Sequence, residues 1–182
     1  SNLYPDRVIG PLTPVWLLWF LFSLTVWKLV LPLVRRLPYS FPLSVLVATG
    51  IGYVNSIGPE FSLSRTLVFF PAFLFGHMFA NRIPEIVRTH RSRLIAIFIA
   101  LSLATPLLRD ATDVTWLWGS LPYSYLSHQV PEILVRLGTI MVGITMSLGF
   151  LAILPTTSYF LNSLGQKTLP LYLLHGLPVL LF

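Results

Sequence analysis

Long apolar stretches recur along the whole chain, and they restrict its possible folds more than any single motif does. Each stretch is bounded by charged residues, Pro, Gly or Asn, and is long enough to predict a helix that crosses or nearly crosses a membrane. The predicted helices run from Thr13 to Val34, Phe41 to Ile57, Leu63 to Ala80, Leu94 to Leu108 and Ile133 to Leu154, and a last one begins near Thr168.

Composition excludes an ordinary water-soluble domain. Hydrophobic residues make up 55% of the 182 residues and charged residues only 10%, whereas a soluble domain averages about 25% charged residues. The mean hydropathy is +0.79. Cysteine is absent, which removes disulfides, thiolate nucleophiles and cysteine metal sites. We therefore expect an all-α fold, a polytopic transmembrane helical bundle with about six membrane helices.

The charges separate onto alternate connectors between these helices. The connectors after the first, third and fifth helices hold Arg35, Arg36, Arg82, Arg88, Arg91, Arg93 and Lys167. The opposite side receives Asp6, Glu60, Asp110, Asp113 and Glu132, with Arg7 and Arg109 nearby. Since Arg and Lys collect on the cytoplasmic side of membranes, the basic connectors are predicted to be cytoplasmic. Residues 111–130 are too polar to cross and are predicted to be external, with Trp116, Trp118, Tyr123 and Tyr125 at the membrane interface.

His175 stands in the apolar ending LPLYLLHGLPVLLF, residues 169–182. Pro178 cannot donate a hydrogen bond to the carbonyl of Leu174, so this helix should bend. A histidine at that depth needs a partner from another helix or a wet cavity. Two interpretations stay open: a neutral imidazole that pins two helices together, or a group that lines a functional site.

Arg65 enters the third predicted helix at its outer end, beside Glu60. The pair is either a surface ion pair or a contact for an anionic or hydroxylated substrate. Further along the same helix, Pro71 leaves the carbonyl of Leu67 without its usual partner. His77 lies nearer the inner end, where a packing or interfacial role is favoured.

Motifs for metal binding, phosphate binding or a serine nucleophile are absent. No two of the four histidines have the i, i+4 spacing, and HExxH, GxxxxGK[ST] and GxSxG do not occur. We expect no metal site. The one alternative that the sequence leaves open is a metal site whose ligands come from distant helices. The segment NRIPEIVRTHRSR, residues 81–93, is basic enough to attract anionic lipid or a phosphate-bearing ligand, although positive-inside topology also explains it.

Three stretches together resemble the acyltransferase family 3 membrane proteins, particularly the fucose 4-O-acetylase-like branch. They are PVWLLWFLFSLTVWKLVLPLV (14–34), LSRTLVFFPAFLFG (63–76) and LNSLGQKTLPLYLLHGLPVLL (161–181), and their order and spacing match the family over nearly the whole chain. The resemblance implies that residues 1–182 are a partial domain similar to the fourth through ninth of about ten helices. The N-terminal helices and the C-terminal end would then be missing.

The resemblance also implies a membrane-bound O-acyltransferase. Such a protein moves an acetyl or other acyl group from acyl-CoA to a hydroxyl of a sugar or cell-envelope glycan, in a bacterial cytoplasmic membrane. The family's proposed catalytic histidine lies in its first helix, which has no counterpart here, so the chain alone is expected to be inactive. The expected partners are acetyl-CoA or another acyl-CoA as donor substrate, the glycan acceptor and membrane lipid, with no bound cofactor and no nucleic acid.

Within that scheme, side and depth suggest roles for seven residues. The candidate cavity residues are His175 and Tyr172, the candidate acceptor contacts are Arg65 and Glu60, and the candidate contacts for donor phosphates are Arg88, Arg91 and Arg93. Two other classes of function remain. One is a transporter or flippase of a glycan or lipid-linked sugar, because broken helices of the kind predicted here are also typical of transporters. The other is a structural membrane subunit.

Six crossings predict opposite sides for Ser92 and Asp113. Because the chain has no cysteine, single reporters can be introduced as S92C and D113C. In sealed membranes an impermeant maleimide should label S92C only from the cytoplasmic side and D113C only from the other. Labelling of both from one side would contradict the predicted alternation.

Overall fold

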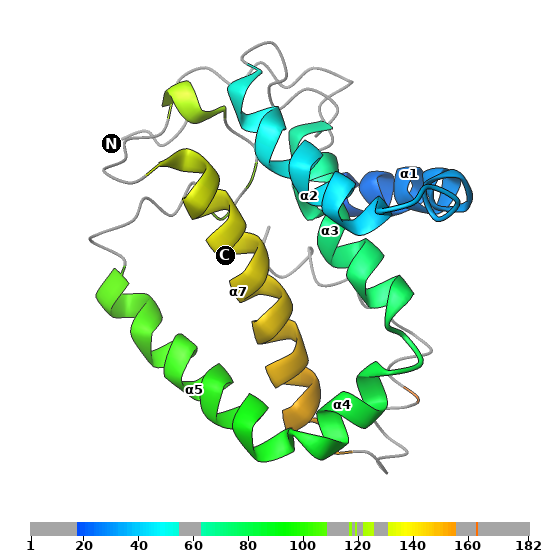
Figure 1. The fold of residues 1–182 in the computed structure, drawn as a ribbon. Coiled ribbons are helices and arrows are strands. Elements are labelled where there is room, and N and C mark those ends of the chain that lie inside the picture. The colour runs from blue at the N-terminus through cyan, green and yellow to red at the C-terminus, as the bar shows by residue number, and fades with distance from the viewer. Residues whose placement is uncertain are drawn as a thin grey trace.

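Helices make up all the regular secondary structure in the part of the chain that the computed structural model describes, which contains no strand (Figure 1). The described residues are 18–54, 63–108, 117, 119, 122–125, 131–155 and 163. The elements are α1 (Leu18–Val34), α2 (Ser40–Gly50) with the 3-10 turn η1 (Ile51–Tyr53), α3 (Leu63–Met78), α4 (Ile83–Thr89), α5 (Arg91–Leu108), the 3-10 turn η3 (Tyr123–Tyr125) and α7 (Glu132–Ile153). The all-α prediction is confirmed for these residues.

Five of the predicted apolar segments coincide with helices. The agreement is best for α7, which begins after Pro131 and has Glu132 in its first turn, where an acidic side chain complements the helix dipole. α5 begins at Arg91, three residues before the predicted start at Leu94. The short helix α4 was not predicted, because it falls in the basic connector. The predicted helix from Thr168 lies outside the described residues.

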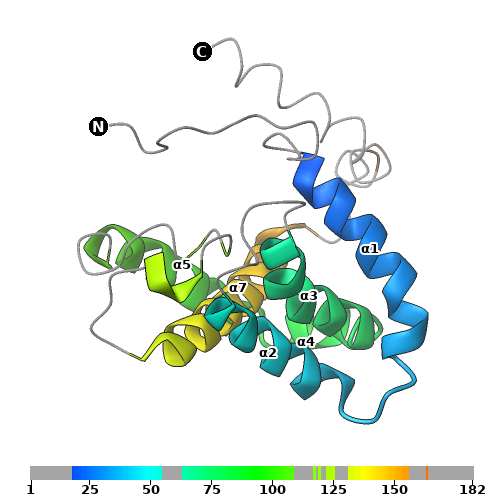
Figure 2. The same ribbon diagram turned by 90° about the horizontal axis from the view of Figure 1, so that it is seen from above.

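α5 and α7 run side by side in opposite directions, and α2 packs in the same antiparallel manner on α3 (Figure 1). α1 is arranged differently. It is viewed almost along its axis in Figure 1, where α3, α5 and α7 are seen from the side, and it is seen lengthwise in Figure 2. α1 therefore crosses α3 steeply instead of extending the bundle as a parallel helix.

Small residues bring α5 and α7 into close contact. A Cβ atom on Gly149 would lie 2.6 Å from the Cβ of Phe98 and 3.0 Å from the carbonyl oxygen of Leu94. Ala152, one turn later, is completely buried. Arg91 donates from Nε to the carbonyl of Ala152 at 3.0 Å. That carbonyl lies in the last turn of α7, where carbonyls have no partner within the helix, so the arginine caps α7 from α5.

Polar side chains join α1 to α3. The indole Nε1 of Trp27 donates to the backbone carbonyl of Thr66 at 2.7 Å, and its ring stacks on Phe73 with centroids 5.2 Å apart. The hydroxyls of Ser23 and Thr66 share a buried hydrogen bond of 2.7 Å. The position of α1 on α3 is thus fixed by specific hydrogen bonds as well as by apolar packing. Nearby, Pro71 is fully buried within α3.

The structure does not support the predicted six membrane crossings. By length and composition, only α7 among the described helices could cross a membrane, and 17% of its span is buried inside the protein. α3 and α4 would meet the same requirement only as a pair, and they are bent by 84° at the break between them. α1 has 17 residues and α2 has 11, fewer than the roughly 20 that a helix needs to cross a bilayer.

Two glycines of α7 allow the α5–α7 contact to be tested. G149A should destabilise the protein by about 1–3 kcal/mol, the usual cost of overpacking, because the added Cβ would meet Phe98. G143A is the matched control, since no atom lies within 4 Å of the new Cβ and alanine favours a helix over glycine. Thermal unfolding of the purified full-length protein measures both. Equal midpoints for the two variants would contradict the close contact.

Candidate functional site

A fully buried arginine lies at the end of the bundle where α3 and α7 begin. Arg136, in the second turn of α7, is 1% exposed. A buried guanidinium is costly unless surrounding groups compensate its charge. Its described surroundings come from α2, α3, α7 and the segment that precedes α7, and we call Thr49, Ser64, Gly119, Tyr123 and Arg136 the polar cluster.

Tyr123 is the aromatic part of the polar cluster. It is 3% exposed, and its hydroxyl donates to the carbonyl of Thr49 at 2.9 Å. The guanidinium carbon of Arg136 lies 5.4 Å from the centroid of its ring, a cation–π contact. The prediction that Tyr123 lies at the membrane interface is therefore wrong. Its hydroxyl satisfies a carbonyl near the end of α2, so the residue folds inward between the helices.

Two glycines make room for this arrangement. Gly119 has φ +61°, a left-handed conformation that side chains rarely adopt, and its carbonyl accepts a 2.7 Å hydrogen bond from the hydroxyl of Ser64. A Cβ there would lie 2.9 Å from Val68 and 3.4 Å from Nη1 of Arg136. At Gly52 a Cβ would overlap the ring of Tyr123. The cluster therefore requires glycine at both positions.

Glu132 brings a carboxylate to the same end of α7, one turn before Arg136. The hydroxyl of Tyr53 donates to its Oε2 at 3.5 Å, and the ring of Tyr53 meets that of Tyr123 edge-on at 4.8 Å. The turn η1 is thus tied to α7 through one polar contact and one aromatic contact. Glutamate followed four residues later by arginine on an apolar helix is the sequence signal that could have identified this cluster.

Arg65 belongs to the same end of the bundle but faces α1. Its guanidinium carbon lies 5.3 Å from the ring centroid of Trp19, and its side chain is half-buried. The sequence also predicts Glu60 as an acceptor contact and Tyr172 and His175 as cavity residues. These three lie outside the described residues. Of the four, only Arg65 lies among the described residues, beside an aromatic ring, and its role as an acceptor contact stays a prediction.

The opposite end carries a basic elbow, defined as Arg82–Arg93, which comprises α4, its flanking residues and the first three residues of α5. Its charged residues are Arg82, Glu85, Arg88, Arg91 and Arg93. Arg88, Arg91 and Arg93 are all exposed. Arg91 in addition donates a hydrogen bond from its Nε to the carbonyl of Ala152. From Arg65 to the end of α3 the chain rises about 20 Å at 1.5 Å per residue. The elbow and the polar cluster are therefore separate sites.

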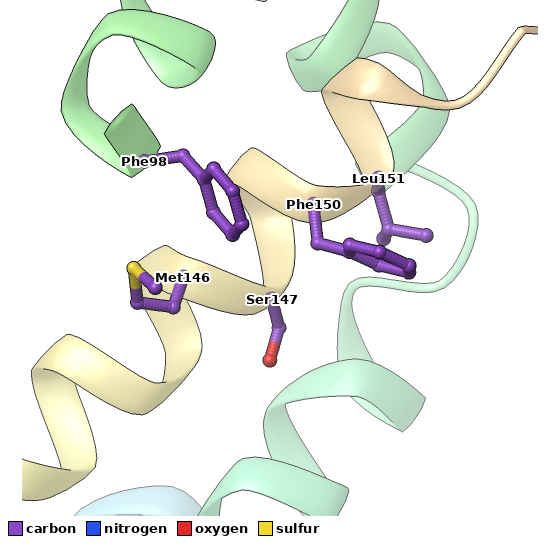
Figure 3. A pocket seen from close by; sticks show the side chains of 5 residues that line it. All are labelled: Phe98, Met146, Ser147, Phe150 and Leu151. Carbon is purple, nitrogen blue, oxygen red and sulfur yellow. The ribbon is translucent and has the colours of Figure 1, made fainter. Parts of the chain in front are cut away.

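A hollow opens on α7 beside α5, about 450 Å³ in volume (Figure 3). Its lining consists of Phe98, Met146, Ser147, Phe150 and Leu151. The only hydroxyl among them, on Ser147, donates to the carbonyl of Gly143 at 2.8 Å. Because that hydroxyl serves its own helix and no titratable group lines the hollow, the lining residues offer a surface for apolar groups and no acid–base chemistry.

Comparisons with known protein families, with curated proteins and with solved structures find no match for this chain. Across the ranges that the structure describes, no three His, Asp or Glu side chains lie close enough together to hold a metal ion. Within the described ranges, the polar cluster, Arg65 and the basic elbow are the groupings of polar and charged side chains that a functional site could use.

The geometry of the polar cluster predicts different effects on stability for alanine substitutions at two neighbouring glycines, Gly50 and Gly52. G52A should destabilise the protein by about 1–3 kcal/mol, because the ring of Tyr123 must leave its place and lose its bond to Thr49. G50A, with open space around its Cβ, should change little. Thermal unfolding of the full-length protein provides the readout for both variants.

A double-mutant cycle adds the control. If Tyr123 is the residue that a larger side chain at position 52 displaces, G52A should cost much less in a Y123A background than alone. Additive effects of the two substitutions would show that Tyr123 does not occupy the space above Gly52.

Proposed function

We propose that this chain is part of a membrane-embedded O-acyltransferase that moves an acetyl or other acyl group from acyl-CoA to a hydroxyl of a sugar or cell-envelope glycan. The observation that supports the proposal best is the chemical difference between the two ends of the bundle. One end exposes arginines for an anionic donor, and the other gathers hydroxyls, aromatic rings and arginines suited to a hydroxylated acceptor. The remaining support is the resemblance of the sequence to acyltransferase family 3.

The donor side is assigned to the basic elbow. Acyl-CoA carries several phosphates, and arginine binds phosphate oxygens through two parallel hydrogen bonds. Arg88 and Arg93 are exposed and can bind in this way. Arg91 adds positive charge to the same surface while it holds the end of α7.

The acceptor side is assigned to the end where α3 begins. Arg65 lies over the ring of Trp19, and an arginine beside an aromatic face offers a sugar both hydrogen-bond donors and an apolar plane. Glu60 would contribute an acceptor for sugar hydroxyls, and His175 and Tyr172 would line the cavity between the two sides. The polar cluster would keep this end of α3 and α7 in place.

The transfer itself forms one bond and breaks another. The acceptor hydroxyl oxygen attacks the thioester carbonyl carbon, the new carbon–oxygen bond replaces the carbon–sulfur bond, and CoA leaves as the thiol with the proton that the hydroxyl gives up. A base must accept that proton, and fixed donors must stabilise the carbonyl oxygen as it becomes negative. By resemblance the base is a histidine in a helix that has no counterpart in these 182 residues, so the residues named here bind and orient the two substrates.

The same proposal places the chain in a bacterial cytoplasmic membrane, with about six helices embedded. α7 has the length and composition for a crossing, and alternate connectors differ in charge as the positive-inside rule expects. The shorter helices α1, α2 and α3 would reach the interface with help from their flanking loops.

A transporter or flippase of a glycan or lipid-linked sugar is the second candidate. It is favoured by the 84° break between α3 and α4 and by Pro71 within α3, because interrupted helices form the binding sites of many transporters. The acyltransferase and the transporter can be distinguished because only the acyltransferase forms an acetylated glycan. Membranes that contain the full-length protein and labelled acetyl-CoA should yield acetyl-labelled glycan for the enzyme and none for the transporter.

The donor assignment can be tested by kinetics. In the full-length protein, the double variant R88Q/R93Q should raise the KM for acetyl-CoA about tenfold, a loss of about 1.4 kcal/mol, with a smaller change in the KM for the acceptor. R35Q/R36Q is the control, since it removes two exposed arginines of another basic connector. Equal effects of the two double variants would mean that the elbow contributes only general positive charge.

Alanine substitutions test the acceptor side. R65A should raise the KM for the acceptor and leave the KM for acetyl-CoA close to that of the parent, and H175A should lower kcat. If both variants fold and transfer acetyl groups as the parent does, the roles proposed for Arg65 and His175 are wrong.

A further inference from the structure

We propose that the hollow beside α5 and α7 binds one acyl chain of an anionic phospholipid, whose phosphate is held by Arg91. The inference rests on the membrane location in the proposed function, but it does not depend on acyl transfer. Its occupant would be a structural lipid at the cytoplasmic face.

The hollow is suited to a hydrocarbon chain. Four of its five lining residues are apolar, and two of them, Phe150 and Leu151, remain 54% and 42% exposed. The side chains labelled in Figure 3 come from α7 except Phe98, which α5 contributes. A volume of about 450 Å³ lies within the range of sites that hold small ligands. A hydrocarbon chain would cover this surface without leaving a buried polar group unpaired, since the Ser147 hydroxyl is already bonded.

Arg91 reaches the end of α7, next to the last residue of the hollow's lining. It donates from Nε to the carbonyl of Ala152, the residue that follows Leu151 in the lining. On α5 it precedes Phe98 by seven residues, about two turns, so both project from the same face of the helix. Its two Nη groups make no hydrogen bond or ion pair within the described residues, and they can donate to a phosphate.

Charge around Arg91 favours an anionic ligand. Arg88 and Arg93 are exposed in the same elbow, and Glu85 is the elbow's one carboxylate. Clusters of basic residues beside a membrane helix attract anionic lipid headgroups. A zwitterionic phospholipid would bring its positive choline group close to the same arginines.

Depth also agrees with a phospholipid. α7 has 22 residues, about 33 Å at 1.5 Å per residue, close to the thickness of the hydrocarbon core. If α7 crosses the membrane, Ala152 at its end lies at the level of the headgroups. The lining residues Met146–Leu151 then lie within the first two turns below, at the level of the acyl chains.

Photocrosslinking can test this site on the full-length protein in lipid nanodiscs. One sample contains phosphatidylglycerol with a diazirine in its acyl chain, and the other contains the same mole fraction of the matched phosphatidylcholine. Adducts are located by mass spectrometry. We expect at least fivefold more labelling of residues 146–151 by phosphatidylglycerol, and R91Q should reduce that labelling to the phosphatidylcholine level.

Three further variants separate lipid binding from a change in the fold. R91K keeps the charge and should retain most of the preference for phosphatidylglycerol, and R82Q, elsewhere on the elbow, should leave it unchanged. S147F fills the hollow without touching Arg91 and should reduce labelling by both lipids at least threefold.

Two results would overturn the site. Equal labelling by the two lipids would mean that ordinary bilayer lipid covers this face. Labelling at Met141 but not at 146–151 would mean that polypeptide fills the hollow. The crosslinking needs no acetyl-CoA, so a protein without acyltransferase activity that still prefers phosphatidylglycerol would refute the proposed enzyme and leave the lipid site intact.

Discussion

Polar groups among apolar helices must find partners within the protein, and this requirement decides how the helices of this chain pack. An unsatisfied donor or acceptor in such surroundings costs several kcal/mol. The partners here join different elements: Trp27 bonds to the Thr66 carbonyl, Ser64 to the carbonyl of Gly119, and Arg91 to the last turn of α7. Each bond fixes one element against another. A small number of polar residues therefore determines how many apolar residues are arranged.

The same requirement separates the two ends of the bundle. At one end a buried arginine and an inward-facing tyrosine join α2 to α7, and Ser64 of α3 bonds to Gly119 beside them. At the other end the arginines of the basic elbow remain exposed, and one of them, Arg91, also caps α7. Buried contacts between helices give the first end rigidity, and exposed positive charge gives the second end affinity for anions. The proposed donor and acceptor sides, and the proposed lipid site next to the elbow, rest on this chemical difference between the two ends.

Large apolar surfaces remain uncovered within the described residues, and α7 is the clearest case, with 17% of its span buried. Exposed apolar patches of this extent mark surfaces that meet lipid or another protein. Close contact between α5 and α7 depends on Gly149, whose missing side chain lets the two backbones approach. The resulting pair presents an apolar outer face and a shallow hollow, as expected of helices that meet hydrocarbon instead of water.

The sequence by itself determined where helices form, because a continuous apolar run favours a helix wherever it occurs; α7 agrees with its prediction to within one residue at each end. Charge placement also identified Arg65 and the basic elbow as candidate site residues. The tertiary structure alone decided that α4 bends away from α3, that α1 crosses steeply, and that Tyr123 is buried. Tyr123 bonds to a carbonyl 74 residues away, and apolar periodicity carries no information about which distant partner a polar group will reach. That choice depends on the space that Gly52 and Gly119 leave open, which exists only once the helices have packed.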